Sequence, residues 1–337
     1  MFYRNSYYQI KRSDHLLAKE RGKPIKIDQL EALLRGLNKN HSKIPLIEPD
    51  LKKRKAGYNG EKAVDYQLSF LKDKKYMVFN DLKLPLAPDH FQIDSLLFTP
   101  YYTLILEIKN ILGTLTIDSD FNQLIRSYNG IESGFQDPVM QVKRLILFLQ
   151  QFFLDHKLTI PPIEYLVVIS NPGTILRMAN GQDRKPPYDK IIHSQNLLSE
   201  VSKLNSIYKE EKISKNEMRK IKRVLLNKHS NIFKSILTNY KISEDEILKG
   251  IYCEICAGKM ERVFGSWYCN YCKFYSKTAH EQKIEDYFLL IKPFITNKEL
   301  RGFLDIDSRK TAEKILASLN LKTTGSTKGT IYHKEFH

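Results

Sequence analysis

The feature that most restricts how this chain can fold is an apolar run that carries two charges. Residues 102–108 are rich in β-branched and aromatic side chains, are broken by Glu107, and are followed by Lys109. These residue types predict a buried β-strand rather than a helix. Strand side chains alternate, so Glu107 and Lys109 emerge on one face while Leu106 and Ile108 point to the other. Because burying an unpaired charge costs several kcal/mol, two charges in a core strand need a reason.

A metal site would supply that reason. The alternating segment 90–94 ends in Asp94, and Pro100 begins a turn that folds the chain back. This hairpin would bring Asp94 beside Glu107, giving two oxygen ligands for Mg²⁺, with Lys109 close enough to act on a bound water or phosphate. The alternative is an edge strand on which Glu107 and Lys109 pair with each other in solvent.

The composition is that of a globular protein with a strong positive charge. The 337 residues leave room for about two or three domains. No apolar stretch reaches the roughly 18 residues that span a bilayer, and the N-terminus lacks the apolar core of a signal peptide, so we expect a cytoplasmic protein. The net charge of +16 favours a polyanion, which we expect to be nucleic acid, and DNA rather than RNA. Binding to an acidic membrane surface is the alternative.

Residues 1–55 are predicted to form an N-terminal helical extension and a linker. Asp28, three residues before Glu31, has the form of a capping box for a short helix over residues 29–37. Residues 45–55 contain two prolines and end in a basic run, and this composition is typical of a linker.

Helices and strands then alternate, which predicts an α/β layer with a mixed sheet. The predicted elements are a helix over 57–71, strands over 77–84, 114–117 and 164–170, and a long amphipathic helix that starts at Asp137. Glu61 falls in the first turn of the first helix, where it either complements the helix dipole or points toward a metal. Gln141 falls in the first turns of the second helix, where it is either solvated or orients a phosphate or water.

Several motifs follow one another in order within residues 55–170. They are Gly57-x-x-Gly60-Glu61, Gln92-Ile93-Asp94, Glu107-Ile108-Lys109-Asn110 with Gly113, and Asp137-Pro138-x-x-Gln141. Together they resemble the nuclease-related domain, NERD, a branch of the PD-(D/E)XK nuclease superfamily. Ile93 stands where the name of the superfamily has proline, which leaves the activity open.

The resemblance implies a restriction-endonuclease-like mixed sheet flanked by helices over residues 56–195. It also implies that Asp94 and Glu107 bind Mg²⁺ or Mn²⁺, that Lys109 supplies catalytic charge, and that Glu61 and Gln141 are accessory polar residues. The expected function is metal-dependent hydrolysis of DNA phosphodiester bonds, in bacterial defence or DNA repair. The alternative is an inactive nuclease fold that binds DNA as a scaffold or regulator.

Residues 196–250 are predicted to form a basic helical connector. Residues 203–241 hold eleven Lys or Arg against three acids. Two helices are expected here, the second capped by Ser214 with Glu217. Their basic faces would either follow a phosphate backbone or remain solvated between domains.

Residues 251–278 are predicted to be a zinc ribbon. Cys253-x-x-Cys256 and Cys269-x-x-Cys272 use all four cysteines of the chain, and each pair can hold one side of a tetrahedral Zn²⁺. The role would be structural, because four thiolates leave no open position on the metal. Two disulfides are the alternative, but a chain without an export signal should keep its thiols reduced.

Residues 279–337 are predicted to form a winged-helix-like domain that binds nucleic acid. Three helices followed by a hairpin are expected, and the third helix would enter a major groove. The residues expected to face DNA are Arg309, Lys310 and Lys314 on this helix and Lys322 and Lys328 on the wing. A helical domain that docks a partner protein is the alternative.

Overall fold

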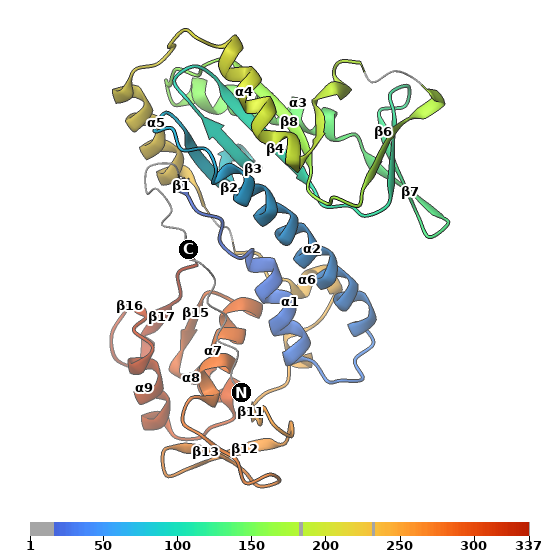
Figure 1. Ribbon diagram of the computed structural model, residues 1–337. Coiled ribbons are helices and arrows are strands. Elements are labelled where there is room, and N and C mark those ends of the chain that lie inside the picture. Colours follow the sequence, from blue (N-terminus) through green and yellow to red (C-terminus); the bar gives the residue numbers. More distant parts are fainter. Residues whose placement is uncertain (1–16, 182–184, 231–232, 337) are drawn as a thin grey trace, which may run out of the picture. The chain divides into compact units, whose positions relative to one another are not determined.

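The computed structural model describes residues 17–181, 185–230 and 233–336 (Figure 1). They gather in two compact units. Unit 1 takes its described residues from Met1–Gly22 and Ala56–Ser230, and unit 2 takes its own from Lys23–Lys55 and Asn231–His337. The predicted extension and the predicted basic connector are therefore each divided between the two units.

Unit 1 is built on a mixed six-stranded sheet, as the α/β prediction required. The strand order is β1-β2-β3-β4-β8-β10. The central strands β2, β3 and β4 are antiparallel, whereas β1, β8 and β10 each run parallel to their neighbour. The bounds are β1 Leu17–Lys19, β2 Met77–Leu86, β3 Asp89–Phe98, β4 Thr103–Lys109, β8 Ile163–Ile169 and β10 Ile191–His193.

Helices cover both faces of this sheet (Figure 1). Apolar residues of α2 (Ile44–Leu68) and α4 (Leu197–Ile207) share one core with the sheet, and those of α3 (Pro138–Asp155) and α5 (Lys215–Lys228) share the other. The start of α3 is fixed by Asp137, whose carboxylate accepts a hydrogen bond from Val139 N at 2.7 Å. The predicted capping box of Ser214 with Glu217 starts α5. The helix caps therefore set which apolar faces meet the sheet.

A second sheet of unit 1 has the strand order β7-β6-β5-β9. Leu115, Ile117 and Leu124 of this sheet join the core beneath α3. Only β5 was predicted, because the other strands show little apolar alternation. The bounds are β5 Thr114–Asp118, β6 Gln123–Tyr128, β7 Ile131–Gln136 and β9 Ile175–Met178, with 3₁₀ turns η1 Ala179–Gly181, η2 Tyr188–Lys190 and η3 Ser194–Asn196.

Two predictions for the N-terminal helices are wrong. Helix α1 spans Ile25–Gly36 and follows Pro24, with no side-chain cap. Asp28 lies inside its first turn and pairs with Lys23 at 2.6 Å instead of capping the helix. The residues predicted as a linker are helical, because α2 already begins at Ile44.

This early start changes the place of Glu61, which lies well inside α2 rather than in a first turn. The two prolines of the segment did not prevent the helix. Pro45 falls in its first turn, where a missing N–H costs nothing. Pro49 lies inside the helix, one turn further on. It has no N–H to donate to the carbonyl of Pro45, so the helix lacks one hydrogen bond near its start.

Unit 2 joins α1, the start of α2, the cysteine ribbon and the C-terminal helices around one core. Leu33, Ile47, Trp267, Phe288 and Leu316 all belong to it and are at most 1% exposed. The bounds are α6 Leu237–Tyr240, η4 Glu244–Glu246, β11 Ile251–Tyr252, β12 Lys259–Val263, β13 Ser266–Cys269, β14 Tyr275–Ser276, α7 Ala279–Leu290, β15 Phe294–Thr296, α8 Asn297–Leu304, α9 Arg309–Ser318, β16 Lys322–Thr324, η5 Thr327–Gly329 and β17 Ile331–His333.

The C-terminal segment follows the order helix, strand, helix, helix, strand, strand. The sequence indicated the helices and the hairpin, but it missed β15, which pairs with β17 in a sheet of order β15-β17-β16. Thr296 and Glu299 form the predicted capping box of α8, and Ser308 caps α9. None of the helices in the described part of the chain is long and apolar enough to cross a membrane.

Candidate active site

The strand pairing of the large sheet lines up three carboxylates. The ladder between β3 and β4 reaches Ser95 opposite Leu106, so one step further places Asp94 opposite Glu107. The ladder between β2 and β3 in the same way places Asp81 opposite Asp94. By this register Asp81, Asp94 and Glu107 form a row across the middle of the sheet, although the ladder of paired residues skips Asp81 and Asp94 themselves.

The regular alternation of the strands breaks at this row. Ile93 and Leu96 enter the same core although they are three residues apart, so β3 changes phase around Asp94. On β2, Asp81 has a left-handed backbone with φ of 50°. The carboxylate of Asp94 turns along the sheet, and its Oδ2 accepts a hydrogen bond from Ile108 N at 2.9 Å. This bond ties the end of β3 to β4 where the charged residues lie.

Glu107 and Lys109 lie on a central strand, between β3 and β8, and not on a solvated edge. Glu107 is only 3% exposed, and its Oε1 accepts a hydrogen bond from Lys109 Nζ at 2.7 Å. Lys109 Nζ also donates to Gln141 Oε1 at 3.0 Å. The structure therefore brings Lys109, Glu107 and Gln141 together, with Gln141 presented by the well-capped start of α3.

Arg21 holds the other side of the site, and no pattern in the sequence points to it. Its side chain is 2% exposed. Its guanidinium donates to Glu61 Oε2 at 2.7 Å, to both carboxylate oxygens of Asp65 at 2.9 and 3.1 Å, to the backbone oxygen of Asp94 at 2.9 Å and to Ser95 Oγ at 2.8 Å. Arg21 comes just after β1, an edge strand too short to be read from an apolar pattern.

Gly60 allows α2 to approach the carboxyl ends of β4 and β8. A Cβ atom at Gly60 would lie 2.4 Å from Ser170 Oγ and 2.5 Å from Asn110 Cβ, which is closer than real contacts allow. The amide of Asn110 also donates to the backbone oxygen of Ala56 at 2.6 Å. Glycine at position 60 therefore allows the close packing of α2 that places the neighbouring Glu61 beside the sheet.

Burial raises the affinity of the acids for protons. It raises the pKa of Glu61 to about 7, although the charge of Arg21 acts in the opposite direction. Burial and then the charge of Asp94 raise the pKa of Glu107 to about 7, against the effect of Lys109. Burial likewise raises the pKa of Asp94, against the N–H of Ile108 and the charge of Lys109. Several carboxylates in a poorly solvated site favour either protons or a cation.

Each of the three predicted acids has one oxygen engaged and one that accepts no hydrogen bond from the described residues. Glu61, Asp94 and Glu107 each accept hydrogen bonds through a single oxygen, from Arg21, Ile108 and Lys109 respectively. The remaining oxygens are hard ligands of the kind that Mg²⁺ takes, so the donor set fits this metal. The three acids do not, however, all converge within 4.8 Å of one another.

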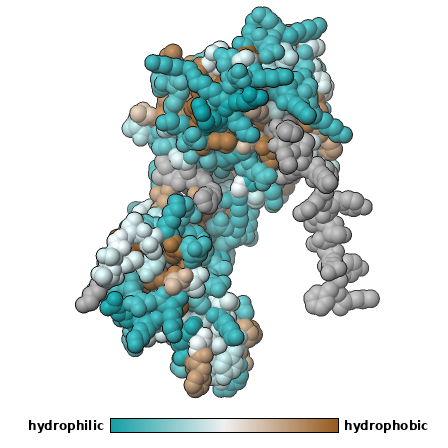
Figure 2. All heavy atoms as spheres, turned by 90° about the vertical axis from the view of Figure 1, so that its left-hand side faces the viewer, coloured by the Kyte–Doolittle hydropathy of each residue, from teal (hydrophilic) through white to brown (hydrophobic). Residues whose placement is uncertain are grey.

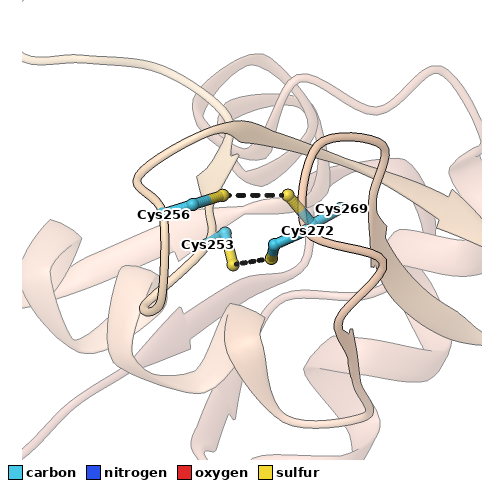
Figure 3. A group of neighbouring side chains, drawn as sticks. All are labelled: Cys253, Cys256, Cys269 and Cys272. Atoms are coloured by element: carbon cyan, nitrogen blue, oxygen red, sulfur yellow. Dashed lines mark hydrogen bonds between the residues drawn. The ribbon is translucent and has the colours of Figure 1, made fainter.

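The four cysteines do converge (Figure 3). Among the described residues they are the one group of three or more His, Cys, Asp or Glu whose ligand atoms all lie within 4.8 Å of one another. The Sγ atoms of Cys253 and Cys272 are 3.5 Å apart, and those of Cys256 and Cys269 are 3.3 Å apart. All four are free thiols, so the predicted alternative of two disulfides is not what the structure contains.

The two halves of the cluster repeat one backbone turn. Cys253 O accepts a hydrogen bond from Ala257 N, and Cys269 O accepts one from Lys273 N. Ala257 and Lys273 have φ of 58° and 62°. The N–H of Cys272 is the main cause that lowers the pKa of Cys269 to about 6, which favours a thiolate there. Against the N–H of Phe274, burial and the other three thiols raise the pKa of Cys272, so without a metal the four sulfurs share protons unequally. The cluster fits a zinc ribbon, as predicted.

The basic residues predicted to face DNA lie in the C-terminal segment of unit 2. Arg309, Lys310 and Lys314 are exposed on α9, and Lys322 is exposed on β16. Arg309 pairs with Glu313 on its own helix, and Lys322 pairs with Glu335. The side chain of Lys328 lies outside what the structure describes. These residues are therefore far along the chain from the carboxylate row, and nothing groups them with it.

Comparison with known proteins identifies one part of the chain. Residues 56–170 match the family model described as the nuclease-related domain, NERD. The match falls on the same residues whose motifs resembled this domain, and it supports a nuclease-related domain in unit 1. A search of curated proteins gave no match, and a search of solved structures gave none either.

Proposed function

We propose that the nuclease-related domain of this chain is a metal-dependent nuclease that hydrolyses phosphodiester bonds of DNA. The observation that carries the proposal is the row of buried acids beside one amine: Asp94 and Glu107 on facing strands, with Lys109 between Glu107 and Gln141. Burial of this much charge has no packing advantage, so it supports a catalytic role.

In this proposal Asp94 and Glu107 bind Mg²⁺ or Mn²⁺, and Glu61 contributes its second oxygen directly or through a water. The metal would polarise the phosphate and generate a nucleophilic water. Lys109 has three N–H donors, of which Glu107 and Gln141 take two. The third would orient the attacking water or stabilise the charge that grows on the phosphate. Gln141 keeps Lys109 in place.

Arg21 acts in this scheme as a positioning residue. It lies outside residues 56–170, yet it binds Glu61, Asp65 and the backbone of Asp94 at once. Such a guanidinium fixes the direction of the carboxylates that would ligate a metal. The segment around β1 would thus complete the site of the nuclease-related domain.

The ribbon and the C-terminal segment would bind the substrate. Four thiolates at 2.3 Å from a tetrahedral Zn²⁺ would be about 3.8 Å apart, close to the observed separations, which supports a structural zinc. The helix and strand order of residues 279–336 supports a winged helix with α9 as its recognition helix. Arg309, Lys310 and Lys314 would then contact DNA, with Lys322 and Lys328 on the wing.

A second function is supported by one observation. Glu61, Asp94 and Glu107 are each engaged by a protein partner and do not converge as the cysteines do. A nuclease fold that has lost hydrolysis and binds DNA as a scaffold or regulator would have this property.

Cleavage assays separate the two functions. The full chain is incubated with plasmid, linear duplex, single-stranded DNA and RNA, with Mg²⁺ or with EDTA. We expect Mg²⁺-dependent cleavage of DNA that Asp94→Asn, Glu107→Gln and Lys109→Ala each abolish while DNA binding persists. Binding without cleavage for any substrate and metal would leave only the scaffold function.

A further inference from the structure

The outer face of the ribbon carries tyrosines that its core does not use. In the sheet β11-β12-β13-β14, Tyr252 lies opposite Lys259, and Tyr268 lies between Glu261 and Tyr275. Since opposite residues share a face, and Lys259 and Glu261 are two apart on one strand, these five residues occupy the same face. The opposite face carries Met260, Trp267 and Cys269, which are buried.

The tyrosine rings are available at the surface. Tyr252 is 38% exposed and Tyr275 is 60% exposed, and the ring centres of Tyr268 and Tyr275 are 4.5 Å apart. Phe264, at the turn between β12 and β13, is fully exposed. Apolar and pale side chains accordingly show at the lower end of the molecule in Figure 2, where β12 and β13 lie in Figure 1. The contact between Tyr268 and Tyr275 stabilises the pairing of β13 with β14, but it leaves most of the Tyr275 ring exposed and does not involve Tyr252.

The charge of the ribbon selects the partner of this face. Residues 251–278 carry four basic residues against two acids. Lys273 Nζ lies 5.8 Å from the ring centre of Tyr268. Lys259 lies beside Tyr252 on the same face and also pairs with Asp305 at 2.5 Å, a contact at the surface that a phosphate would have to share. Aromatic rings with amines beside them can bind single-stranded nucleic acid. The rings stack on unpaired bases, and the amines attract the negative phosphates.

We propose that the face formed by Tyr252, Tyr268 and Tyr275 binds single-stranded nucleic acid by stacking. The proposal rests on nucleic acid being the partner of this protein, as in the proposed function. Neighbouring strands are about 4.8 Å apart and residues two apart on one strand are about 6.8 Å apart, so Tyr252 and Tyr268 are separated by roughly 12 Å along the diagonal, enough for two or three nucleotides. Single-stranded ends or junctions would be held by the ribbon while the helical segment holds duplex.

The test measures binding of full-length protein to a labelled oligothymidylate of about 12 nucleotides and to a duplex of equal length, by fluorescence anisotropy. Glu107→Gln is used as the background, so that the probes are not cleaved. We expect the double variant Tyr252→Leu/Tyr275→Leu to lose at least about tenfold in affinity for the single strand, since each stacked base contributes roughly 1–3 kcal/mol. Affinity for the duplex should stay within about twofold.

Two controls keep the result specific. The Phe variants at the same positions retain the rings and should bind the single strand as the background protein does. Tyr66→Leu changes an equally exposed tyrosine of unit 1 (55% exposed) and should have no effect. Zinc content is measured for every variant to show that the ribbon is intact.

Three results would overturn the proposal: no binding of the single strand by the background protein, Leu variants that bind as well as tyrosine, or equal losses for single strand and duplex. Each can be told apart from failure of the proposed function, which is read separately from cleavage by the unmutated chain. Tyrosine-dependent binding without cleavage would sink the nuclease and leave the stacking face. Cleavage by the unmutated chain, with single-strand binding that does not depend on the tyrosines, would support the nuclease and overturn the stacking face.

Discussion

Single residues of the candidate site show how a polar group is kept in a core. Glu61, Asp94 and Glu107 are each stabilised by a different donor, and each keeps an oxygen that has no partner in the part of the chain that the structure describes. These contacts offset only part of the desolvation, as the raised pKa values of all three acids indicate. In the absence of metal, ionisation of these acids therefore lowers the free energy of unfolding.

Glu107→Gln tests this at one position. The pKa of Glu107 is about 7 in the folded protein, against an ordinary value of 4.5. Between these pH values the folded state binds more protons than the unfolded chain, so the free energy of unfolding falls as pH rises. Gln stays neutral, so Glu107→Gln should be more stable than the wild type by roughly 1–3 kcal/mol near pH 8 without metal, and little different near pH 4. Urea unfolding at the two pH values measures this; a variant that is less stable at both contradicts it.

Arg21→Met tests positioning against charge. Removing a cation beside acids would by itself strengthen Mg²⁺ binding, whereas losing the orientation of Glu61 and Asp94 would weaken it. We expect the Mg²⁺ dissociation constant from calorimetry to rise about tenfold or more, and kcat to fall by a similar factor. Arg21→Lys keeps the positive charge but loses the planar guanidinium that binds several acceptors at once. Its Mg²⁺ dissociation constant and kcat should lie between those of the wild type and of Arg21→Met.

Arg126→Met is the matched control for Arg21→Met. Arg126 also donates to a backbone oxygen, that of Leu112, but it lies in the second sheet of unit 1. It should leave Mg²⁺ binding unchanged. Tighter or unaltered Mg²⁺ binding in Arg21→Met would show that Arg21 contributes charge or stability only.

At the scale of elements, the strands and helices that carry the site were predictable from the sequence, and their supports were not. Residues 102–109 predicted β4, because a strand buried on both faces of a sheet has a nearly continuous apolar sequence. The capping pairs of α5 and α8 are local, so they could be read directly. By contrast β1 and β15 are three residues long and pair with strands far along the chain, which no local pattern records. Strand β6 pairs with its neighbours β5 and β7, but it is mostly polar and shows little apolar alternation.

The same distinction explains the errors at α1 and α2. Asp28 and Glu31 have the spacing of a capping box, but both bind Lys23, and the helix begins earlier at a proline. Residues 45–55 have the composition of a linker, yet Ile47 is buried in the core of unit 2. Local ion pairs account for the error at α1, whereas at α2 tertiary burial overrode local propensity.

Two glycines of α2 allow a matched test of the packing of this helix. Gly60→Ala would place a Cβ against Ser170 and Asn110, and we expect it to lower the free energy of unfolding by about 1–3 kcal/mol. Gly57→Ala meets nothing within 4 Å and should raise it by about 0.5–1 kcal/mol, as alanine does in a helix. Denaturant unfolding of both variants measures the difference. Equal effects would mean that α2 does not approach β4 and β8 as described.

Removal of the ribbon metal is a test at the same scale. Trp267, the single tryptophan, is buried in the core of unit 2, and its Nε1 donates to His280 Nδ1. We expect about one zinc per chain, and a fall of about 10 °C or more in the Tm of unit 2 on chelation, followed by tryptophan fluorescence. Cys272→Ser should have the same effect. A chain without zinc whose fluorescence and Tm do not respond to chelators would exclude a structural metal.

For the whole molecule, the division into two units, each with its own core, predicts two separable responses. Calorimetry should resolve a transition that Mg²⁺ shifts upward, belonging to unit 1, and another that zinc removal shifts downward, belonging to unit 2. Mg²⁺ at about 100 times its dissociation constant should add about 2.7 kcal/mol to the first transition alone. A single transition that moves with either metal would mean that the units do not respond separately.

Unit 2 is formed by two segments that are far apart in the chain, and this has a consequence for its folding during synthesis. Its first segment, Lys23–Lys55, emerges from the ribosome before all of Ala56–Ser230, while the rest of its core waits until Asn231–His337 has been made. Leu30, Leu33 and Ile47, which are fully buried at the end, must spend that interval without their final neighbours. A nascent chain halted anywhere before the ribbon would display these side chains, so premature termination should yield a product that chaperones and proteases recognise.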